Sequence, residues 1–185
     1  MMRYASSTYH VREPAQALFE IARSETRDIP KPTETNLRVI RVTGDGKCMF
    51  RSLALGLAAS RNQSMSSSRE ETEADQLRMA VFDAMCKSTK RRMDFPEAII
   101  AVKAESDFDR YCKRVQKPSF WGGEAELLVL SKMLKQPIGV YLPDKKHGGF
   151  RLIQEYGAKF NIENGGKRKV IKLLYNGQNH YDLLL

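Results

Sequence analysis

The sequence contains no long hydrophobic run and little cysteine or histidine. None of its apolar stretches approaches the roughly 18 to 20 residues that a membrane-spanning helix requires, and the N-terminus lacks the compact apolar segment of a secretory signal. The first twelve residues faintly resemble an organelle transit peptide, although Glu13 and Glu20 follow almost at once. We therefore expect no membrane partner and a location in the cytoplasm or nucleus, with an organelle as the weaker alternative.

The chain has three cysteines, Cys48, Cys86 and Cys112. Their odd number and wide spacing fit neither a disulfide framework nor a C-x-x-C zinc site. The sequence thus predicts reduced thiols, no metal and no organic cofactor. Cys86 and Cys112 lie in helical patterns and are expected to be small buried core residues.

Acidic residues are fewer than basic ones, 22 against 31, and the formal net charge is +9. Clustered lysine and arginine attract nucleic acid. The basic clusters at 87–92 and 165–169 are short, however, and no nucleic-acid-binding motif accompanies them. We expect a solvated basic surface and no nucleic-acid partner, and keep a basic RNA-binding protein as the weakest alternative.

With 185 residues and 42% hydrophobic content, the chain suits one substantial domain. Residues 1–36 are interpreted as an N-terminal extension, with a short amphipathic helix at 13–25 and a proline-rich extended linker at 27–35. The main domain is expected at 37–185.

The main domain begins with a strand at 37–44 and a helix from about Cys48 to Ala59. The serine-rich segment 60–75 is predicted to be a mobile loop, with a capping box of Ser68 and Glu71 opening the next helix. Further helices are expected to about residue 86, at 95–104, at 106–115 and within 120–136, and then strands at 138–142, 149–156, 169–175 and 180–185. Because helices precede strands, we predict an α+β fold with a mostly antiparallel sheet.

Cys48 lies between a glycine-rich turn and a helical run, in "GDGKCMFRSLA". The positive end of a helix stabilises a thiolate, and Lys47 adds a neighbouring charge. The two glycines let the backbone N–H groups of residues 45–48 converge into a hollow for an oxyanion. Cys48 is therefore a candidate nucleophile.

A thiolate nucleophile needs a base, and the chain has three histidines. His10 lies in the N-terminal extension, and His147 lies in a polar hairpin turn. His180 begins the last strand, where Asp182 shares its face because residues two apart point the same way. Asp182 can hold one imidazole nitrogen and aim the other at Cys48. By residue type alone, Cys48 and His180 are also ordinary packing residues.

Three motifs decide between these readings. "GDGKCMFRSLA" resembles the cysteine box D-G-x-C-x-[FY]-R of the ovarian tumour (OTU) family of deubiquitinating cysteine proteases. "FWGGEAELLVLSKMLKQPIGVY" resembles that family's W-G-G-x-x-E-[LI] helix and following P-I-x-V strand, and "NHYDLLL" is similar to its closing N-H-Y-D box. The motifs occur in the family's order, and the resemblance covers about residues 37–185.

The resemblance implies a papain-like fold and hydrolysis of isopeptide bonds between the ubiquitin C-terminus and lysine. Cys48 would be the nucleophile and His180 the base that then protonates the leaving amine. Asp182 would orient His180 and is ranked above Asp45 as the third member of the catalytic triad. Asp45, often counted among the family's catalytic residues, would hold the oxyanion loop (Asp45, Gly46, Lys47 and Cys48) in shape. The implied partner is ubiquitin or a polyubiquitin chain, bound by a monomer. An inactive ubiquitin-binding module of the same fold is the first alternative.

The other matched residues are expected to have mainly structural roles. Phe50 and Leu53 would anchor the nucleophile helix, and Arg51 would be a surface or loop-bracing cation. Lys47 would either favour the thiolate or be solvated. From the second motif we expect a core or groove-wall tryptophan, two glycines that permit a tight approach and an acidic first helical turn; these residues are Trp121, Gly122, Gly123, Glu124 and Glu126.

Overall fold

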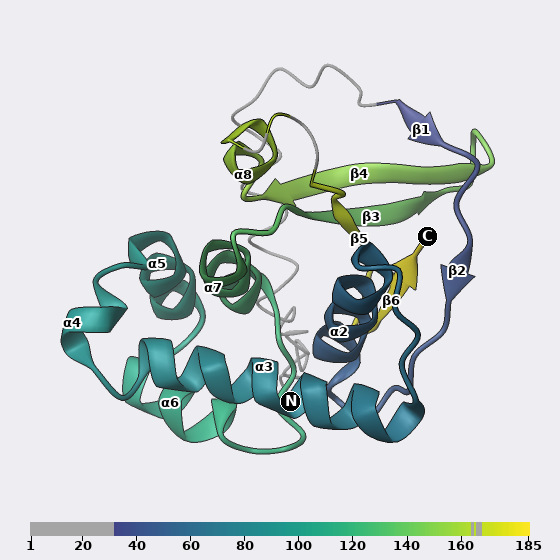
Figure 1. Cartoon of the computed structure of the whole chain (residues 1–185). Helices are drawn as coiled ribbons and strands as arrows, with labels where there is room; N and C mark the ends of the chain where they lie inside the picture. Colours follow the sequence, from purple (N-terminus) through teal and green to yellow (C-terminus); the bar gives the residue numbers. More distant parts are fainter. Residues whose placement is uncertain (1–31, 164, 166–167) are drawn as a thin grey trace, which may run out of the picture.

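The computed structural model describes residues 32–163, 165 and 168–185, shown in Figure 1. The helix expected at 13–25 and most of the 27–35 linker lie outside these residues. The strands are β1 (Thr33–Glu34), β2 (Val39–Ile40), β3 (Ile138–Asp144), β4 (Gly149–Tyr156), β5 (Ile171–Tyr175) and β6 (Tyr181–Leu184). The helices are α2 (Cys48–Ser60), α3 (Ser67–Met85), α4 (Thr89–Arg92), α5 (Pro96–Glu105), α6 (Phe108–Val115), α7 (Glu124–Leu134) and α8 (Lys159–Glu163).

The strands form one sheet in the order β1-β4-β3-β5-β6-β2. Every neighbouring pair is antiparallel except β3 and β5, which run parallel in the middle of the sheet. A parallel pair needs a crossover, and here the chain between β3 and β5 passes through β4 and α8. The predicted α+β class and the four C-terminal strands are confirmed, with this one parallel pair in the sheet.

The main core lies between the sheet and helices α2, α3, α5 and α7, which share one side of it (Figure 1). Phe50 and Leu53 of α2 have no exposed surface, as predicted for anchors of the nucleophile helix. The buried hydroxyl of Ser52 also donates to the carbonyl oxygen of Tyr181, 3.2 Å away. The start of α2 is thereby held directly against β6.

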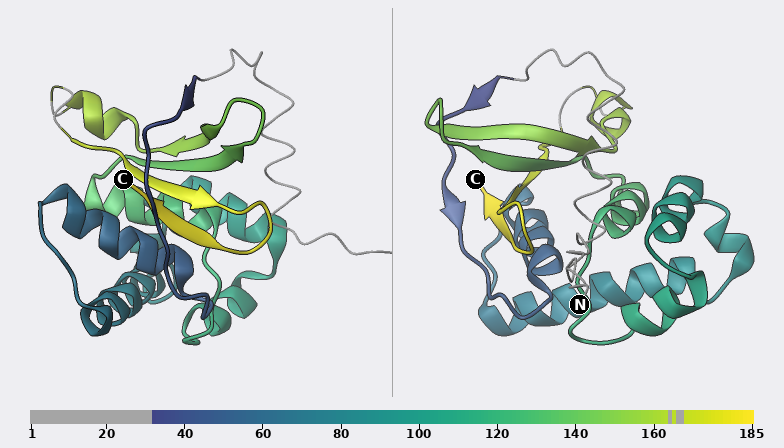
Figure 2. Two further views of the ribbon diagram at one scale, coloured as in Figure 1. Left: turned by 90° about the vertical axis from the view of Figure 1, so that its right-hand side faces the viewer. Right: turned by 180° about the vertical axis from the view of Figure 1, so that it is seen from behind.

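The segment joining β1 to β2 connects the two edges of the sheet and passes over the face opposite α2 (Figure 2). Leu37 and Val39 pack there against Tyr141, Leu174 and Leu184, a small second core. Residues 33–34, expected in the linker, thus form an edge strand. Among the described residues, no helix is both long and apolar enough to span a bilayer.

The predicted extent of the loop at 60–75 is wrong, because only residues 61–66, between α2 and α3, lie outside a helix. Helix α3 begins at Ser67, and its N-cap is Ser66, whose side chain accepts the backbone N–H of Arg69 at 3.3 Å. The Ser68–Glu71 capping box is therefore wrong as well. A serine cap followed by good helix formers is sufficient to start the helix, and tertiary contacts to α2 then stabilise this polar turn.

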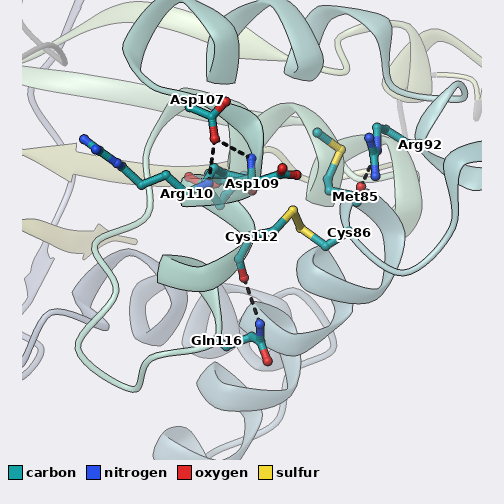
Figure 3. Close-up of a disulfide and its surroundings, with 10 residues drawn as sticks. Met85, Cys86, Arg92, Asp107, Asp109, Arg110, Cys112 and Gln116 are labelled. Atoms are coloured by element: carbon teal, nitrogen blue, oxygen red, sulfur yellow. Dashed lines mark hydrogen bonds between the residues drawn. A yellow bond between two sulfur atoms is a disulfide. The ribbon is translucent and has the colours of Figure 1, made fainter.

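Cys86 and Cys112 form a disulfide, which contradicts the prediction of reduced core thiols. The bond joins the end of α3 to the middle of α6, with Cα atoms 5.7 Å apart (Figure 3). Both residues are only partly buried. The spacing of three cysteines along the chain does not reveal that α3 and α6 pack side by side.

Candidate active site

Cys48 is the first residue of α2 and is only 4% exposed. Its Sγ lies 4.0 Å from the carbonyl oxygen of Asn179, and the backbone N–H of Tyr181 donates toward the sulfur. These two contacts come from the residues on either side of His180. The fold therefore brings the N-terminus of α2 to the start of β6, as the predicted pairing of Cys48 with His180 requires.

His180 and Asp182 interact as predicted from their two-residue spacing. Nε2 of His180 lies 3.0 Å from Oδ1 of Asp182. Nδ1 is then the other ring nitrogen, and a Cβ built on Gly44 would lie 3.5 Å from it. The Nδ1 side of the ring therefore lies against Gly44, at the start of the loop that leads to Cys48.

Asp182 is almost fully buried, with its side chain 3% exposed. Its carboxylate also accepts the backbone N–H of Val42 at 3.1 Å and Nη1 of Arg41 at 2.7 Å. Three donors from two neighbouring strand segments thus fix the carboxylate. Arg41 and Val42 were not identified from the sequence, because their contact with Asp182 depends on the pairing of β2 with β6.

Asn176, whose role was not predicted from the sequence, stabilises the turn before His180. Oδ1 of Asn176 accepts the backbone N–H groups of Gln178, Asn179 and His180 at 2.9 to 3.0 Å. Asparagine commonly caps turns in this way. An asparagine directly before a glycine, in "NGQN", was the available signal.

Asp45 braces the loop before Cys48. Its Oδ1 accepts the backbone N–H of Lys47 at 3.0 Å, and its Oδ2 accepts Nη2 and Nε of Arg51 at 2.6 and 3.1 Å. Burial works against ionisation of Asp45, but the hydrogen bonds from Arg51 and Lys47 outweigh it and lower its pKa. Arg51 is confirmed as a loop-bracing cation and is buried rather than on the surface.

The backbone of this loop needs glycine at position 46. Gly46 has φ +89°, and a Cβ there would lie 2.9 Å from the carbonyl oxygen of Ser119. Lys47 then serves as N-cap of α2 without a side-chain cap. The first N–H groups of the helix have no intrahelical acceptor, which leaves them available to an oxyanion.

The electrostatics differ from the sequence prediction. Burial raises the pKa of the Cys48 thiol, and the charge of Asp45 adds to this, while N–H groups of Tyr181 and Met49 work in the opposite direction. Lys47 neither faces the sulfur nor is solvated, because Nζ is directed to Glu71 and Asp75 of α3, 2.8 and 3.3 Å away. The uncharged thiol is therefore the favoured resting form.

Comparisons with known proteins agree with this geometry. The family model described as OTU-like cysteine protease matches residues 43–181, which contain Cys48, His180 and Asp45. The chain belongs to this OTU family. Asp182 lies one residue beyond the matched segment.

Two Arabidopsis thaliana proteins are similar to this OTU chain. The OVARIAN TUMOR DOMAIN-containing deubiquitinating enzyme 3 is 47% identical in an alignment of 156 residues, which covers 79% of this chain and 67% of that protein. Enzyme 4 of the same name is 36% identical, over 84% of this chain and 45% of that protein. The chain thus spans two thirds of one relative and less than half of the other.

Solved structures support the OTU fold. The OTU domain of OTUD1 has a TM-score of 0.57 at 16% identity, covering 94% of this chain and 96% of that one. An OTU deubiquitinase from Wolbachia pipientis wMel bound to ubiquitin has a TM-score of 0.54 at 20% identity, covering 81% and 96%. The predicted OTU fold is confirmed.

A cavity of about 530 Å³ opens beside Cys48 in the OTU domain. Its walls come from the ends of α5 and α7, from α6 and from the turn before His180; they include Gly46, Glu105, Tyr111, Trp121, Glu124 and Asn179. Trp121 is 50% exposed and is a groove-wall residue, the second of its two predicted roles. The cavity gives a substrate access to the otherwise buried sulfur.

The W-G-G motif of the OTU domain builds the wall facing Cys48. A Cβ on Gly122 would clash with the side chain of Met49 and come within 2.9 Å of Phe50, so Gly122 does permit a close approach, but to α2 and not to the next helix as predicted. Gly123 has nothing within 4 Å of such a Cβ, and the same prediction is wrong for it. Glycine at 122 brings the wall against the nucleophile helix.

Glu126 is not merely an acid in the first turn of α7. It is buried, and its carboxylate accepts the N–H of Gly123 and the hydroxyl of Tyr111, each at 2.7 Å. Burial raises its pKa, against the effect of these hydrogen bonds. Glu126 therefore joins the W-G-G wall to α6, a role that depends on Tyr111 and was missed in the sequence.

The other two histidines lie away from Cys48 or outside the described residues. His147 is exposed in the β3–β4 turn, where Nδ1 lies 2.9 Å from Oδ2 of Asp144. His10 lies outside the described residues. Within the described part of the chain, no group of three or more histidine, cysteine, aspartate or glutamate side chains has an arrangement that could hold a metal ion.

Proposed function

We propose that this chain is a thiol-dependent deubiquitinase that hydrolyses isopeptide bonds at the C-terminus of ubiquitin. The observation that carries the proposal is the meeting of Cys48 with the strand of the His180–Asp182 pair at one end of a cavity. The two Arabidopsis relatives carry deubiquitinase names, and the Wolbachia OTU protein was solved with ubiquitin. We assign residues 37–185 to the catalytic domain and 1–36 to an extension.

In the first half of the reaction, Nδ1 of His180 accepts the thiol proton as Sγ of Cys48 attacks the isopeptide carbonyl carbon. The carbonyl oxygen becomes an oxyanion, which receives hydrogen bonds from N–H groups of the loop 45–48. The C–N bond then breaks, and His180 gives its proton to the departing lysine amine. A thioester between Cys48 and the ubiquitin C-terminus remains.

In the second half, water enters the site of the departed amine and loses a proton to His180 as it attacks the thioester. The C–S bond breaks, His180 returns the proton to the sulfur of Cys48, and the ubiquitin C-terminus leaves as a carboxylic acid that releases its own proton to solvent. Asp182 holds Nε2 of His180 throughout and stabilises the imidazolium that forms twice. The cycle uses no metal or organic cofactor.

The raised pKa of Cys48 makes the proton transfer to His180 part of catalysis. A buried thiol that is uncharged at rest reacts slowly with small electrophiles, because only the thiolate is nucleophilic. A substrate that fills the cavity and places its carbonyl against the loop makes proton transfer productive. This favours a deubiquitinase that reacts faster with ubiquitin-based electrophiles than with simple alkylating reagents.

The decisive experiment uses ubiquitin with a thiol-reactive C-terminal alkyne. We expect a covalent adduct with the wild-type chain, none with Cys48→Ala, and strong slowing with His180→Ala. His147→Ala is the matched control, because its imidazole is exposed in the β3–β4 turn, and it should react as the wild type does.

Two outcomes would contradict the proposal. Reversible ubiquitin binding without an adduct favours the inactive ubiquitin-binding module. Binding of RNA alone, with an affinity that falls steeply as salt rises, favours the basic RNA-binding protein. Hydrolysis of ubiquitin dimers of defined linkage, followed by gel electrophoresis, then identifies the preferred substrate.

The cytoplasm or nucleus remains the proposed location, and the disulfide gives it a test. Disulfides are rare in those compartments, because glutathione and thioredoxin keep thiols reduced. Rapid alkylation of cells before lysis, followed by mass spectrometry of Cys86 and Cys112, reports their state. Alkylated cysteines support a reducing compartment, whereas an intact bond places the chain in an oxidising one.

A further inference from the structure

Lys47 has an unusual environment for a lysine next to a nucleophile. Its side chain is only 7% exposed, although it lies on a polar loop beside the cavity. Nζ lies 2.8 Å from Glu71 and 3.3 Å from Asp75, with Asp45 at 4.0 Å. Burying an ammonium group is costly unless it is paired, so the acids of α3 determine where this side chain lies.

The backbone of Lys47 forms the link between Gly46 and Cys48. Its N–H donates to Asp45 at 3.0 Å, and its carbonyl oxygen accepts the N–H of Arg51 at 2.9 Å. A side chain anchored on α3 restricts rotation of the peptide units on both sides of Lys47. One of these carries the N–H of Cys48, a candidate donor to the oxyanion.

We infer that Glu71 and Asp75, acting through Lys47, are positioning residues for the loop before Cys48. The inference rests on the proposed function, since it assigns the loop's N–H groups to a reaction. It also gives catalytic importance to the first turns of α3. These turns contact neither the sulfur nor the cavity wall described above.

The Lys47 anchor adds to the Asp45–Arg51 pair and adjoins it, since Glu71 also lies 3.6 Å from Nη2 of Arg51. Asp45 and Arg51 are fixed positions of the D-G-x-C-x-[FY]-R motif, whereas Lys47 occupies its variable position. Arg51 also reaches α3, through Glu70 at 3.2 Å. Lys47 therefore supplies a second attachment of the same loop to the same helix.

If Lys47 acted on the sulfur directly through its charge, Glu71→Gln would change activity in the opposite direction. If its charge stabilised the thiolate, Glu71→Gln would free that charge and raise activity. If Glu71 positions the loop through Lys47, Glu71→Gln and Lys47→Met both lower activity. Glu71 is the better residue to test, because its second contact, with Arg51, is long at 3.6 Å, whereas Asp75 also pairs with Arg78 at 3.0 Å.

The experiment measures kcat and KM on ubiquitin with a fluorogenic C-terminal amide. We expect Lys47→Met to lower kcat by on the order of 10- to 100-fold, because small misplacements of reacting groups have effects of this size. Glu71→Gln should lower kcat less, since Asp75 remains. KM should change little, because neither residue lines the cavity wall that receives the substrate.

Two further variants separate positioning from general stability. Lys47→Arg keeps the charge and the reach to both acids, and it should recover most of kcat. The double variant Lys47→Met/Glu71→Gln should have a kcat close to that of Lys47→Met alone, because without Lys47 the carboxylate of Glu71 keeps only its longer contact with Nη2 of Arg51, at 3.6 Å. Lys172→Met is the matched control, since Lys172 pairs with Glu34 on the sheet face away from α2, and it should retain wild-type kcat.

Hydrogen exchange of the backbone amides at 46–48 supplies a readout that does not require ubiquitin. Faster exchange in Lys47→Met and Glu71→Gln, but not in Lys172→Met, supports the anchor. Wild-type exchange together with wild-type kcat in Lys47→Met overturns it, as does an increase in kcat in Glu71→Gln. If the wild type cleaves no ubiquitin substrate, the proposed function fails, and exchange at 46–48 alone then decides whether the network holds the loop.

Discussion

His180 and Asp182 lie on a strand that backbone hydrogen bonds hold on both sides, whereas the loop before Cys48 is held by charged side chains of another helix. β6 pairs with β5 and with β2. The loop instead depends on Glu70, Glu71 and Asp75 of α3, 19 to 28 residues from their partners in the sequence.

We call β6 with His180 and Asp182 the strand half of the site, and the loop before Cys48 with the helices that hold it, α3 and its neighbour α6, the helix half. The two halves should respond differently to substitution. A backbone ladder is nearly independent of side-chain identity, so the position of β6 tolerates substitution. A charge network loses its geometry when one member is changed, and it responds to pH and salt. We therefore expect variants in the strand half to affect chemistry more than stability, and variants of the charge network itself to affect both.

Asp182→Asn should give the largest effect in this comparison. An asparagine keeps the shape but presents an amide to Nε2 of His180 and no longer stabilises the imidazolium, so kcat should fall by on the order of 10³- to 10⁴-fold. The fold should be retained, because β6 remains paired, and the thermal midpoint should fall only modestly, through weaker hydrogen bonds from Val42 and Arg41. Steady-state kinetics and calorimetry on the same samples check both halves of this prediction; a loss of kcat below about 10-fold would show that Asp182 does not orient His180 for catalysis.

The double variant Cys86→Ser/Cys112→Ser should lower stability in the helix half. The disulfide closes a loop with a sequence separation of 26 residues. Chain-entropy arguments give about 3.5 kcal/mol for a loop of this size. Urea unfolding at neutral pH measures this loss, and kcat under native conditions should be retained.

Hydrogen exchange locates the effect of the missing disulfide. Amides of α3 and α6 should exchange faster in the double variant, whereas those of β5 and β6 should lose less protection. Reductant provides the control, since it should lower the urea midpoint of Cys48→Ala and leave the double variant unchanged. Equal loss of protection in both regions would show that the two halves unfold as one unit.

Asp45→Asn should have a smaller effect on stability, and this effect should depend on pH. The pKa of Asp45 is lowered in the folded protein, so its ionised form contributes stability above the usual value of 3.8, and this contribution is lost as pH falls through the lowered pKa. We expect a loss of about 1–3 kcal/mol at pH 7, the range for hydrogen bonds to charged groups. Urea unfolding at several pH values should show the variant and the wild type converging in acid, and a constant difference would contradict the assignment.

The sequence allowed the strand half of the site to be predicted because its determinants are local. Asp182 follows His180 by two residues, and that spacing alone places them on one face of a strand. Phe50 and Leu53 follow Cys48 at helical spacing and were correctly expected in the core. In each case one helix or strand contains both the residue spacing and the positions that the spacing predicts.

The helix half was predicted less well because its determinants belong to different elements. Segment 60–75 has no apolar face, and its first helical turns are stabilised by Lys47 and Arg51 of α2 and its N-cap loop. The disulfide requires that α3 and α6 be neighbours, and the burial of Glu126 requires Tyr111 of α6. No sequence pattern within any one of these segments indicates which other segment it contacts.

Arg41→Met should give the smallest effect, and it tests whether charge contributes anything in the strand half. Arg41 donates to Asp182 at 2.7 Å, yet its side chain is 79% exposed, so water and salt screen the pair. We expect kcat to fall by about 2- to 3-fold at low ionic strength, and the difference from the wild type to vanish near about 1 M salt, where the screening length is short. Arg38→Met removes the same charge from a residue whose backbone pairs with Leu185, and it should leave kcat unchanged at every salt concentration. A larger loss that persists in high salt would mean that the strand half, like the loop before Cys48, depends on a side-chain charge to hold its geometry.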